Sequence, residues 1–400
     1  MIGAILLIIF LALVNQGLFN FFEKKHPFFS RKLMNRLYLY HLLIGVVYYT
    51  YAQFNPSDSI AYFNRPQAES LSWGDFFGTS TTFIDFISYP FINGLGFTYE
   101  MMMALYMWIG FLGFLFAYLF FRENIPVKIK VFKKIDFLIL ILFLPNMHYW
   151  TSSLGKGAPI FLGLMMFAYA LKDPKNRFIL MVLSSSLIYF IRPHMFLFVA
   201  VGTVLGYMSG QEKVSLGKKI LIYVGLVGGL VVIQDQILAV AGLEDSENLA
   251  ADFQDFSENR AAELGKSGSG VDMSSYSLPF KLFTFWFRPL FIDAPGIMGL
   301  IVSIENLIYL LLFGKILQKS FLKFIRRAPI AVKMSLVVFL SASFAMTFVM
   351  SNLGIIIRQK SMVMYFIFFV IYYFLAQKKY NKILKLRKLR SRRIKQMEVV

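Results

Sequence analysis

Long apolar runs recur along the chain up to residue 376, and short polar segments separate them. Spans are predicted at about 2–22, 35–53, 99–121, 136–151, 157–171, 178–191, 195–208, 219–241, 294–314, 332–350 and 361–376. A helix needs roughly 20 apolar residues to cross a bilayer, where only helices and closed barrels satisfy the backbone. The pattern therefore predicts an all-α, polytopic transmembrane helical bundle of about eleven spans.

Two pairs of predicted spans are shorter than a perpendicular crossing requires. They cover 136–171 and 178–208, and a short polar turn joins the two members of each pair. We expect short or broken helices here, because such backbone survives at membrane depth only when buried in protein or lining a wet cavity. The pattern thus favours an extracytoplasmic cavity between these helices.

Composition supports a single membrane-embedded unit. Hydrophobic residues make up 58% of the 400 residues and charged residues 16%, against roughly 45–50% and about 25% in soluble domains. The chain contains no cysteine, which excludes disulfides and thiolate metal sites. We predict one transmembrane domain over 1–376, with outer loops 54–98 and 241–282, and a basic cytoplasmic tail over 377–400.

The net charge of +19 is interpreted as a signal of orientation in the membrane more than of an anionic binding partner. Lys and Arg are retained on the cytoplasmic side of membrane proteins. With the N-terminus outside, alternating loops place 32 of the 41 basic residues inside, which predicts N-out, C-in. The basic tail is interpreted as a topology anchor that contacts anionic lipid. No nucleic-acid-binding fold is recognisable, so nucleic acid is not an expected partner.

The remaining basic residues lie on the predicted outer side, where topology does not require them. They are Arg65, Lys156, Arg192, Arg260, Lys266, Lys281, Arg288, Arg358 and Lys360. Several of them stand where a span meets the surface, beside a Pro, a Gly or a polar break. Arginine matches two phosphate oxygens at once, so the set is typical of a site for a lipid-linked diphosphate at headgroup depth. The alternative is snorkelling, or pairing with the acidic stretch 244–263.

The two outer loops differ in character. Aromatic residues alternate with polar ones over 73–91, which suits an amphipathic helix in the membrane interface. A Gly/Ser stretch at 265–270 predicts a mobile loop or lid. Asp58 begins the first loop. It could act as a general base for an acceptor hydroxyl, or cap a helix that starts at Ser59.

Polar residues inside the predicted spans form a separate group. Asp235, Glu305 and Asn306 occupy costly positions, so each should have a buried partner. His148 and His194 are isolated in the sequence, and no two histidines have metal-ligand spacing, which argues against zinc. A divalent cation could bind Asp58, but no second acidic residue is adjacent in the sequence to act as a further ligand.

Several short motifs resemble one family. WTSSLGK at 150–156 resembles a WSSGxGK signature, and PSDSIAY at 56–62 resembles a DSxxY block. RPH at 192–194, FRPL at 287–290 and ENL at 305–307 resemble later blocks of the same set. These blocks occur in multi-pass bacterial surface-polysaccharide proteins, similar to O-antigen and exopolysaccharide polymerases and to GT-C glycosyltransferases. The resemblance runs from about residue 55 to 360. The family often has an acidic residue after the signature lysine, where this chain has Gly157.

The resemblance implies a polymerase that transfers glycan from an undecaprenyl-pyrophosphate carrier at the periplasmic face of the bacterial inner membrane. The expected partners are a lipid-linked oligosaccharide, membrane lipids and a chain-length regulator or other assembly protein. No cofactor is expected, and a divalent cation on Asp58 has no further support in the sequence. The basic residues would hold the diphosphate, and Asp58 would orient or deprotonate the acceptor. The implied catalytic residues are Asp58, Arg192, His194, Arg288 and Arg358. The implied substrate-binding residues are Lys156, Tyr62, Ser152, Ser153, Arg260, Gln359 and Lys360.

Three other functions remain open at this point. A transporter or flippase for a lipid-linked or anionic substrate would also use broken helices and an arginine-lined cavity, with groups reachable from both faces. A non-catalytic component of a secretion or envelope complex would lack a convergent outer pocket. A membrane acyltransferase would need a histidine-centred site, for which only His194 is available.

Overall fold

The computed structural model describes residues 1–68, 70–212, 215–217, 219–220, 223–224, 228, 270–271, 273, 276–294, 296–349 and 352–397. Helices dominate this part of the chain. Its one sheet is an antiparallel pair, β1 (Lys130–Val131) and β2 (Ile135–Asp136), which turns the chain back between two helices. The predicted all-α class is confirmed.

The helices match the predicted spans closely. The longer ones are α1 (Ile2–Lys25), α2 (Arg31–Phe54), α5 (Tyr99–Asn124), α8 (Gly157–Ala170), α9 (Phe178–Ile191), α10 (Pro193–Ser209), α14 (Gly296–Phe313), α16 (Ile330–Val349) and α17 (Leu353–Met397). The shorter ones are α3 (Asp58–Asn64), η1 (Arg65–Gln67), η2 (Trp73–Phe76), α4 (Thr81–Tyr89), η3 (Pro90–Gly94), α6 (Phe137–Leu142), α7 (Pro145–Trp150), α13 (Leu278–Phe287) and α15 (Lys319–Arg326). The predicted span at 219–241 lies outside the described residues except at its N-terminal end.

Five of the described helices are long and apolar enough to cross a membrane: α1, α5, α14, α16 and the part of α17 up to Leu389. Four shorter apolar segments, 137–150, 157–170, 178–191 and 193–209, accompany them. α1 and α14 also expose large apolar side chains such as Leu6, Phe10 and Ile297, which water would not tolerate in a contiguous band. These features indicate a multi-pass helical membrane protein.

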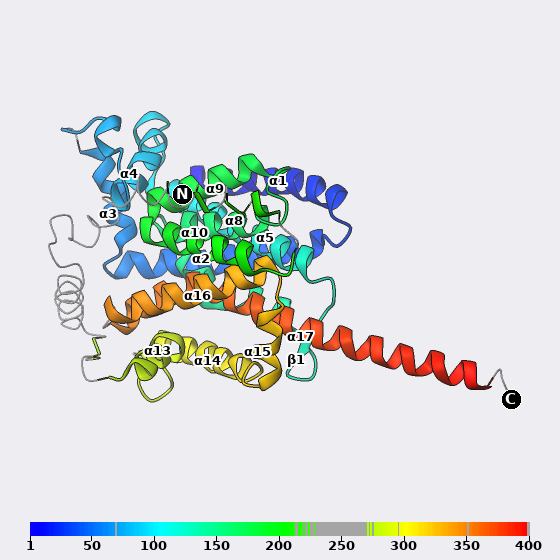
Figure 1. Cartoon of the computed structure of the whole chain (residues 1–400). Coiled ribbons are helices and arrows are strands. Elements are labelled where there is room, and N and C mark those ends of the chain that lie inside the picture. The colour runs from blue at the N-terminus through cyan, green and yellow to red at the C-terminus, as the bar shows by residue number, and fades with distance from the viewer. Residues whose placement is uncertain are drawn as a thin grey trace.

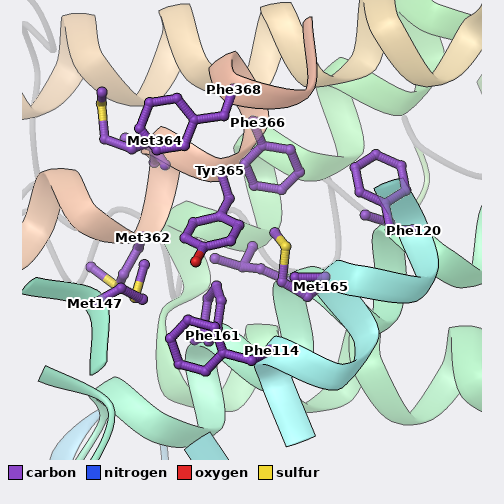
Figure 2. Packing of buried hydrophobic residues seen from close by; sticks show 14 of the residues in the cluster. Phe114, Phe120, Met147, Phe161, Met165, Met362, Met364, Tyr365, Phe366 and Phe368 are labelled. Atoms are coloured by element: carbon purple, nitrogen blue, oxygen red, sulfur yellow. The ribbon is translucent and has the colours of Figure 1, made fainter. Parts of the chain in front are cut away.

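The first half of α17 is the central helix of the bundle. Figure 1 shows α1, α2, α5, α8, α9 and α10 on one side of α16 and α17, and α13, α14 and α15 on the other. Residues 361–372 of α17 are all buried, as expected for a helix that is apolar on every face. Figure 2 shows Tyr365 of α17 directed toward Phe161 and Phe114, and its ring lies 5.1 Å from that of Phe161.

α10 and α16 approach each other closely through glycines at four-residue spacing. A Cβ built on Gly202 would lie 3.0 Å from the Met334 carbonyl, and one on Gly206 would lie 3.0 Å from the Ile330 carbonyl. Small residues at this spacing allow helix backbones to pack tightly within membranes, where packing and not the hydrophobic effect drives association.

The segment 136–151, predicted as one member of a short or broken pair over 136–171, is itself interrupted. α6 ends at Leu142, and α7 restarts at Pro145, whose ring sets the first turn and whose missing N–H needs no partner there. His148 of α7 is distant from other histidines in the sequence, but in the structure it contacts one of them. Its Nε2 donates to the Leu142 carbonyl at 2.7 Å, and its Nδ1 lies 2.9 Å from Nδ1 of His41 on α2. The break therefore fixes a buried histidine pair whose members are 107 residues apart.

Three boundaries differ from prediction. α17 begins at Leu353, so Arg358 lies in its second turn and not in a polar break outside the last span. The outer loop predicted to reach residue 282 is already helical from Leu278. The basic tail continues α17 as helix to Met397, and Figure 1 shows it projecting beyond the bundle.

Candidate functional site

The segment 55–98 folds over one end of the bundle and joins the turns between the short helices. Ser80 lies at its centre: its N–H donates to the Phe190 carbonyl of α9 at 2.6 Å. Its Oγ accepts from Lys156 Nζ at 2.6 Å. Phe83 of α4 stacks on Phe190 with ring centroids 4.8 Å apart. The α7–α8 turn and the last turn of α9 are thereby both held against the segment 55–98.

Four basic residues gather at this end, and we call them the basic cluster: Arg65, Lys156, Arg192 and Arg358. They come from η1, the α7–α8 turn, the α9–α10 turn and α17. Burial, reinforced by the three arginines, lowers the pKa of Lys156 from 10.5 to about 8. Burial and the nearby Arg358 also lower the pKa of Arg192, to about 10. Like charges this close disfavour one another, so the cluster favours an anion.

Carboxylates neutralise only part of this charge. The Arg65 guanidinium donates two hydrogen bonds, of 2.7 and 3.0 Å, to the Asp85 carboxylate of α4, and Asp85 is 2% exposed. Arg358 Nη1 donates to Asp58 at 2.7 Å. Four cations against two carboxylates leave two positive charges uncompensated among these residues.

Among the described residues, Lys156 and Arg192 are the cations of the cluster without a carboxylate partner. Lys156 donates to a neutral serine hydroxyl, and the buried Nε of Arg192 has no hydrogen-bond partner among the described residues. A buried guanidinium N–H left unpaired is costly and rare in native proteins. An anion bound here would satisfy it. His194, one of the predicted catalytic residues, lies near enough to both cations for their charges to act on it.

The signature segment 150–156 forms the turn that presents Lys156. Ser152 is buried and its Oγ donates to the Tyr149 carbonyl at 3.0 Å, so it stabilises the turn. Gly155 has φ +145, which L side chains rarely adopt, and a Cβ there would lie 3.1 Å from the Tyr62 ring. The ring of Tyr62 in turn lies 4.5 Å below the Arg65 guanidinium. Tyr62 and Ser152 therefore shape the site, and Ser153 is buried beside them.

Asp58 is not the helix cap that one reading of the sequence suggested. Ser57 caps α3, and its Oγ accepts from the Ser59 N–H at 3.3 Å. Asp58 occupies the first helical position, where its side chain is 66% exposed and pairs with Arg358. The carboxylate is thus accessible at the edge of the basic cluster. Its predicted role as a base stays a prediction.

Arg288 and Lys360, predicted to join the cluster, are engaged elsewhere. Arg288 pairs with Asp293 and also reaches the Tyr276 hydroxyl at 3.4 Å. Lys360 is fully buried, and its Nζ donates to Asn306 Oδ1 at 2.7 Å and to the Arg288 carbonyl at 2.8 Å. Both residues therefore belong to a polar network inside the bundle.

That network supplies the buried partners expected for the polar residues of α14. Glu305 accepts from the Asn146 N–H at 2.9 Å and from the Tyr309 hydroxyl. Asn306 donates to the Pro289 carbonyl at 2.7 Å. Asn146 also donates through Nδ2 to the Ile357 carbonyl, 3.2 Å away, in the turn that carries Arg358. The network ties α7 and α17 to α14 directly beneath the basic cluster.

The other predicted residues divide into two groups. Arg260, Lys266 and Asp235 lie outside the described residues. Gln359 lies on α17 with a buried Oε1 that has no partner among the described side chains. Lys281 lies 5.3 Å from the Phe348 ring, away from the cluster.

Sequence reasoning missed Asp85, Ser80 and His41. A signal existed for Asp85, because it is the one charged residue in the apolar stretch TTFIDFISY at 81–89. An acidic residue there requires a cationic partner. Among the described residues, no group of three metal-ligating side chains is close enough to hold a metal ion.

Comparison of the chain with protein-family models, characterised proteins and solved structures gives no match.

Proposed function

We propose that this chain is a membrane glycosyltransferase of the polysaccharide-polymerase type that acts on a glycan linked to a lipid diphosphate. The observation that carries the proposal is the excess of positive charge in the basic cluster. Within the part of the chain that the structure describes, two of these cations lack a carboxylate, and one has a buried N–H without a partner. A diphosphate diester carries two negative charges and oxygens that Arg and Lys bind well.

The proposed reaction divides two tasks between neighbouring residues. The acceptor hydroxyl oxygen attacks the anomeric carbon of the donor sugar, and the bond from that carbon to the diphosphate oxygen breaks. The lipid diphosphate leaves with the electron pair, and Lys156 and Arg192 stabilise the charge that develops on it. The hydroxyl proton passes to the Asp58 carboxylate. Arg358 engages Asp58 in the structure, and a diphosphate that competes for Arg358 would release the carboxylate.

The membrane placement of the site follows from the same reasoning. We propose about eleven spans, N-out and C-in, which puts the segment 55–98 and the basic cluster on the extracytoplasmic side. In a bacterial inner membrane this is the periplasmic face. A lipid-linked diphosphate would then present its headgroup at the depth of Lys156 and Arg192.

Reconstitution tests the proposal directly. Purified protein in lipid nanodiscs is incubated with lipid-linked oligosaccharide extracted from the native host, and products are resolved by size. We expect longer glycans and released lipid diphosphate from the wild type. We expect at least a tenfold lower rate from Arg192→Lys and from Arg358→Lys, because Lys lacks the planar fork. Arg31→Lys is the control, since Arg31 is outside the basic cluster, where it pairs with Glu23 at 3.6 Å and donates to Gln16 at 3.3 Å. Full activity in both cluster variants would contradict the proposal.

A flippase for the same lipid class is the second candidate. The interrupted helix α6–α7 and the buried Lys360 beside Asn306 favour it, because transporters place broken helices and buried ionisable groups near the membrane centre. Transbilayer movement of a fluorescent lipid diphosphate in proteoliposomes, without any change in glycan length, would support this alternative over the transferase.

A further inference from the structure

Four aromatic rings from two helices lie together next to the basic cluster. We call Tyr48, Tyr51, Tyr149 and Trp150 the aromatic patch. Tyr149 of α7 lies at its centre, with ring centroids 4.9 Å from Tyr48 and 6.4 Å from Tyr51 of α2. Trp150 lies 5.2 Å from Tyr149 and 6.4 Å from Tyr48. The patch therefore joins the outer end of α2 to the last turn of α7.

The aromatic patch is continuous with the reactive edge of the site. The Arg358 guanidinium lies 5.6 Å from the Trp150 ring, and the same guanidinium holds Asp58. The Tyr48 hydroxyl lies 3.0 Å from Oγ of Ser57, the residue that caps α3 immediately before Asp58. A ligand group resting on the patch would thus lie beside the Asp58 carboxylate.

Part of this aromatic surface is accessible. Tyr51 is 41% exposed, and Tyr149 and Trp150 are partly exposed, while Tyr48 is buried beneath them. Tyr and Trp are also common where helices meet the membrane interface. In that role each Tyr or Trp acts separately and holds its own helix at the interface. Here the rings contact one another, and one of them, Trp150, lies beside the guanidinium of the Arg358–Asp58 ion pair, which an anchoring role does not require.

We propose that the aromatic patch is a glycan subsite, on which a sugar ring of the acceptor rests so that its hydroxyl faces Asp58. This inference depends on the proposed function and specifies where the acceptor binds. A pyranose ring has an apolar face of C–H groups with partial positive charge, and aromatic faces carry partial negative charge. Tyr and Trp supply this contact area with few rotatable bonds to immobilise. The basic cluster would hold the diphosphate, and the patch would hold uncharged sugar.

The experiment compares two probes that share the diphosphate and differ in the glycan. Geranylgeranyl diphosphate has no sugar, and lipid-linked oligosaccharide from the native host has both groups. We expect Tyr149→Leu to weaken binding of the lipid-linked oligosaccharide by about three- to tenfold, the size of an aromatic stacking contact. Its affinity for geranylgeranyl diphosphate should stay within about twofold. Tyr149→Phe, which keeps the ring, should bind both probes as the wild type does.

A matched control separates a subsite from an interfacial anchor. Trp73 is 48% exposed and stacks on Phe86 at 5.2 Å, away from the aromatic patch. Trp73→Leu should leave the affinity for both probes unchanged. If Tyr149→Leu binds the lipid-linked oligosaccharide normally, or loses both probes equally, the glycan subsite is wrong. If the wild type binds neither probe, the proposed function is wrong and the subsite falls with it.

Discussion

Replacing Arg192 with glutamine should separate ligand binding from stability. Among the described residues, Arg192 has no carboxylate partner and its Nε has no acceptor, and it lies close to the positive charges of Arg358 and Lys156. A hydrogen bond to a charged group contributes about 1.5–3 kcal/mol. Since about 1.4 kcal/mol is a factor of ten in affinity, we expect Arg192→Gln to weaken binding of geranylgeranyl diphosphate by roughly 10- to 150-fold.

The same change should not destabilise the fold. Arg192→Gln breaks no ion pair with another described residue and relieves repulsion, so the variant without ligand should unfold at the wild-type temperature or slightly above it. Arg65→Gln is the contrast, because it leaves Asp85, which is 2% exposed, without its partner. An unpaired buried group costs about 1–3 kcal/mol, so this variant should unfold several degrees lower. Calorimetric titration and thermal unfolding in the same detergent measure both quantities. An Arg192→Gln protein that binds the diphosphate normally, or unfolds as early as Arg65→Gln, would refute the reasoning.

Three further outcomes follow from named contacts. Because the pKa of Lys156 is about 8, Lys156 loses its positive charge above that pH, and affinity for geranylgeranyl diphosphate should fall about tenfold from pH 7 to pH 9; Lys156→Arg should flatten this profile. Gly155→Ala places a Cβ at φ +145 and 3.1 Å from the Tyr62 ring, so thermal unfolding should show a loss of about 1–3 kcal/mol. Lys360→Met removes the donor to Asn306 Oδ1 and to the Arg288 carbonyl. The variant should unfold at a lower temperature, with a loss of about 1–3 kcal/mol in the free energy of unfolding. An unchanged affinity for geranylgeranyl diphosphate would place Lys360 outside the binding site.

The helices could be predicted from the sequence because the membrane imposes a local rule. An apolar run must satisfy its own backbone, so its length and limits are visible in the sequence itself. The prediction was wrong at the start of α17, where Arg358, Gln359 and Lys360 suggested a surface segment. Lys360 is instead buried and donates hydrogen bonds to Asn306 and to the Arg288 carbonyl at the end of α13, which are 54 and 72 residues away in sequence. Such long-range partners cannot be identified from one sequence.

The candidate site was predictable in part for a similar reason. Lys156, Arg192 and Arg358 attracted notice because the predicted topology gave no reason for basic residues on the outer side. The structure brings these three together and assigns Arg288 to Asp293 instead. The neutralising pair of Arg65 with Asp85 became visible only in three dimensions. It is this pair, with Asp58, that determines how much positive charge the site retains.

The length of α17 limits what its basic end can touch. At 1.5 Å per residue, its 45 residues extend over roughly 68 Å, of which the part beyond residue 376 accounts for about 30 Å. Electrostatic attraction in physiological salt fades over about 8 Å. With residue 376 at headgroup level and the helix straight, only Lys378, Lys379 and Lys382 remain within reach of anionic lipid. The more distant Lys385, Arg387 and Lys388 are exposed and would then stand in the aqueous phase, where salt ions or an acidic surface from another molecule must balance their charge.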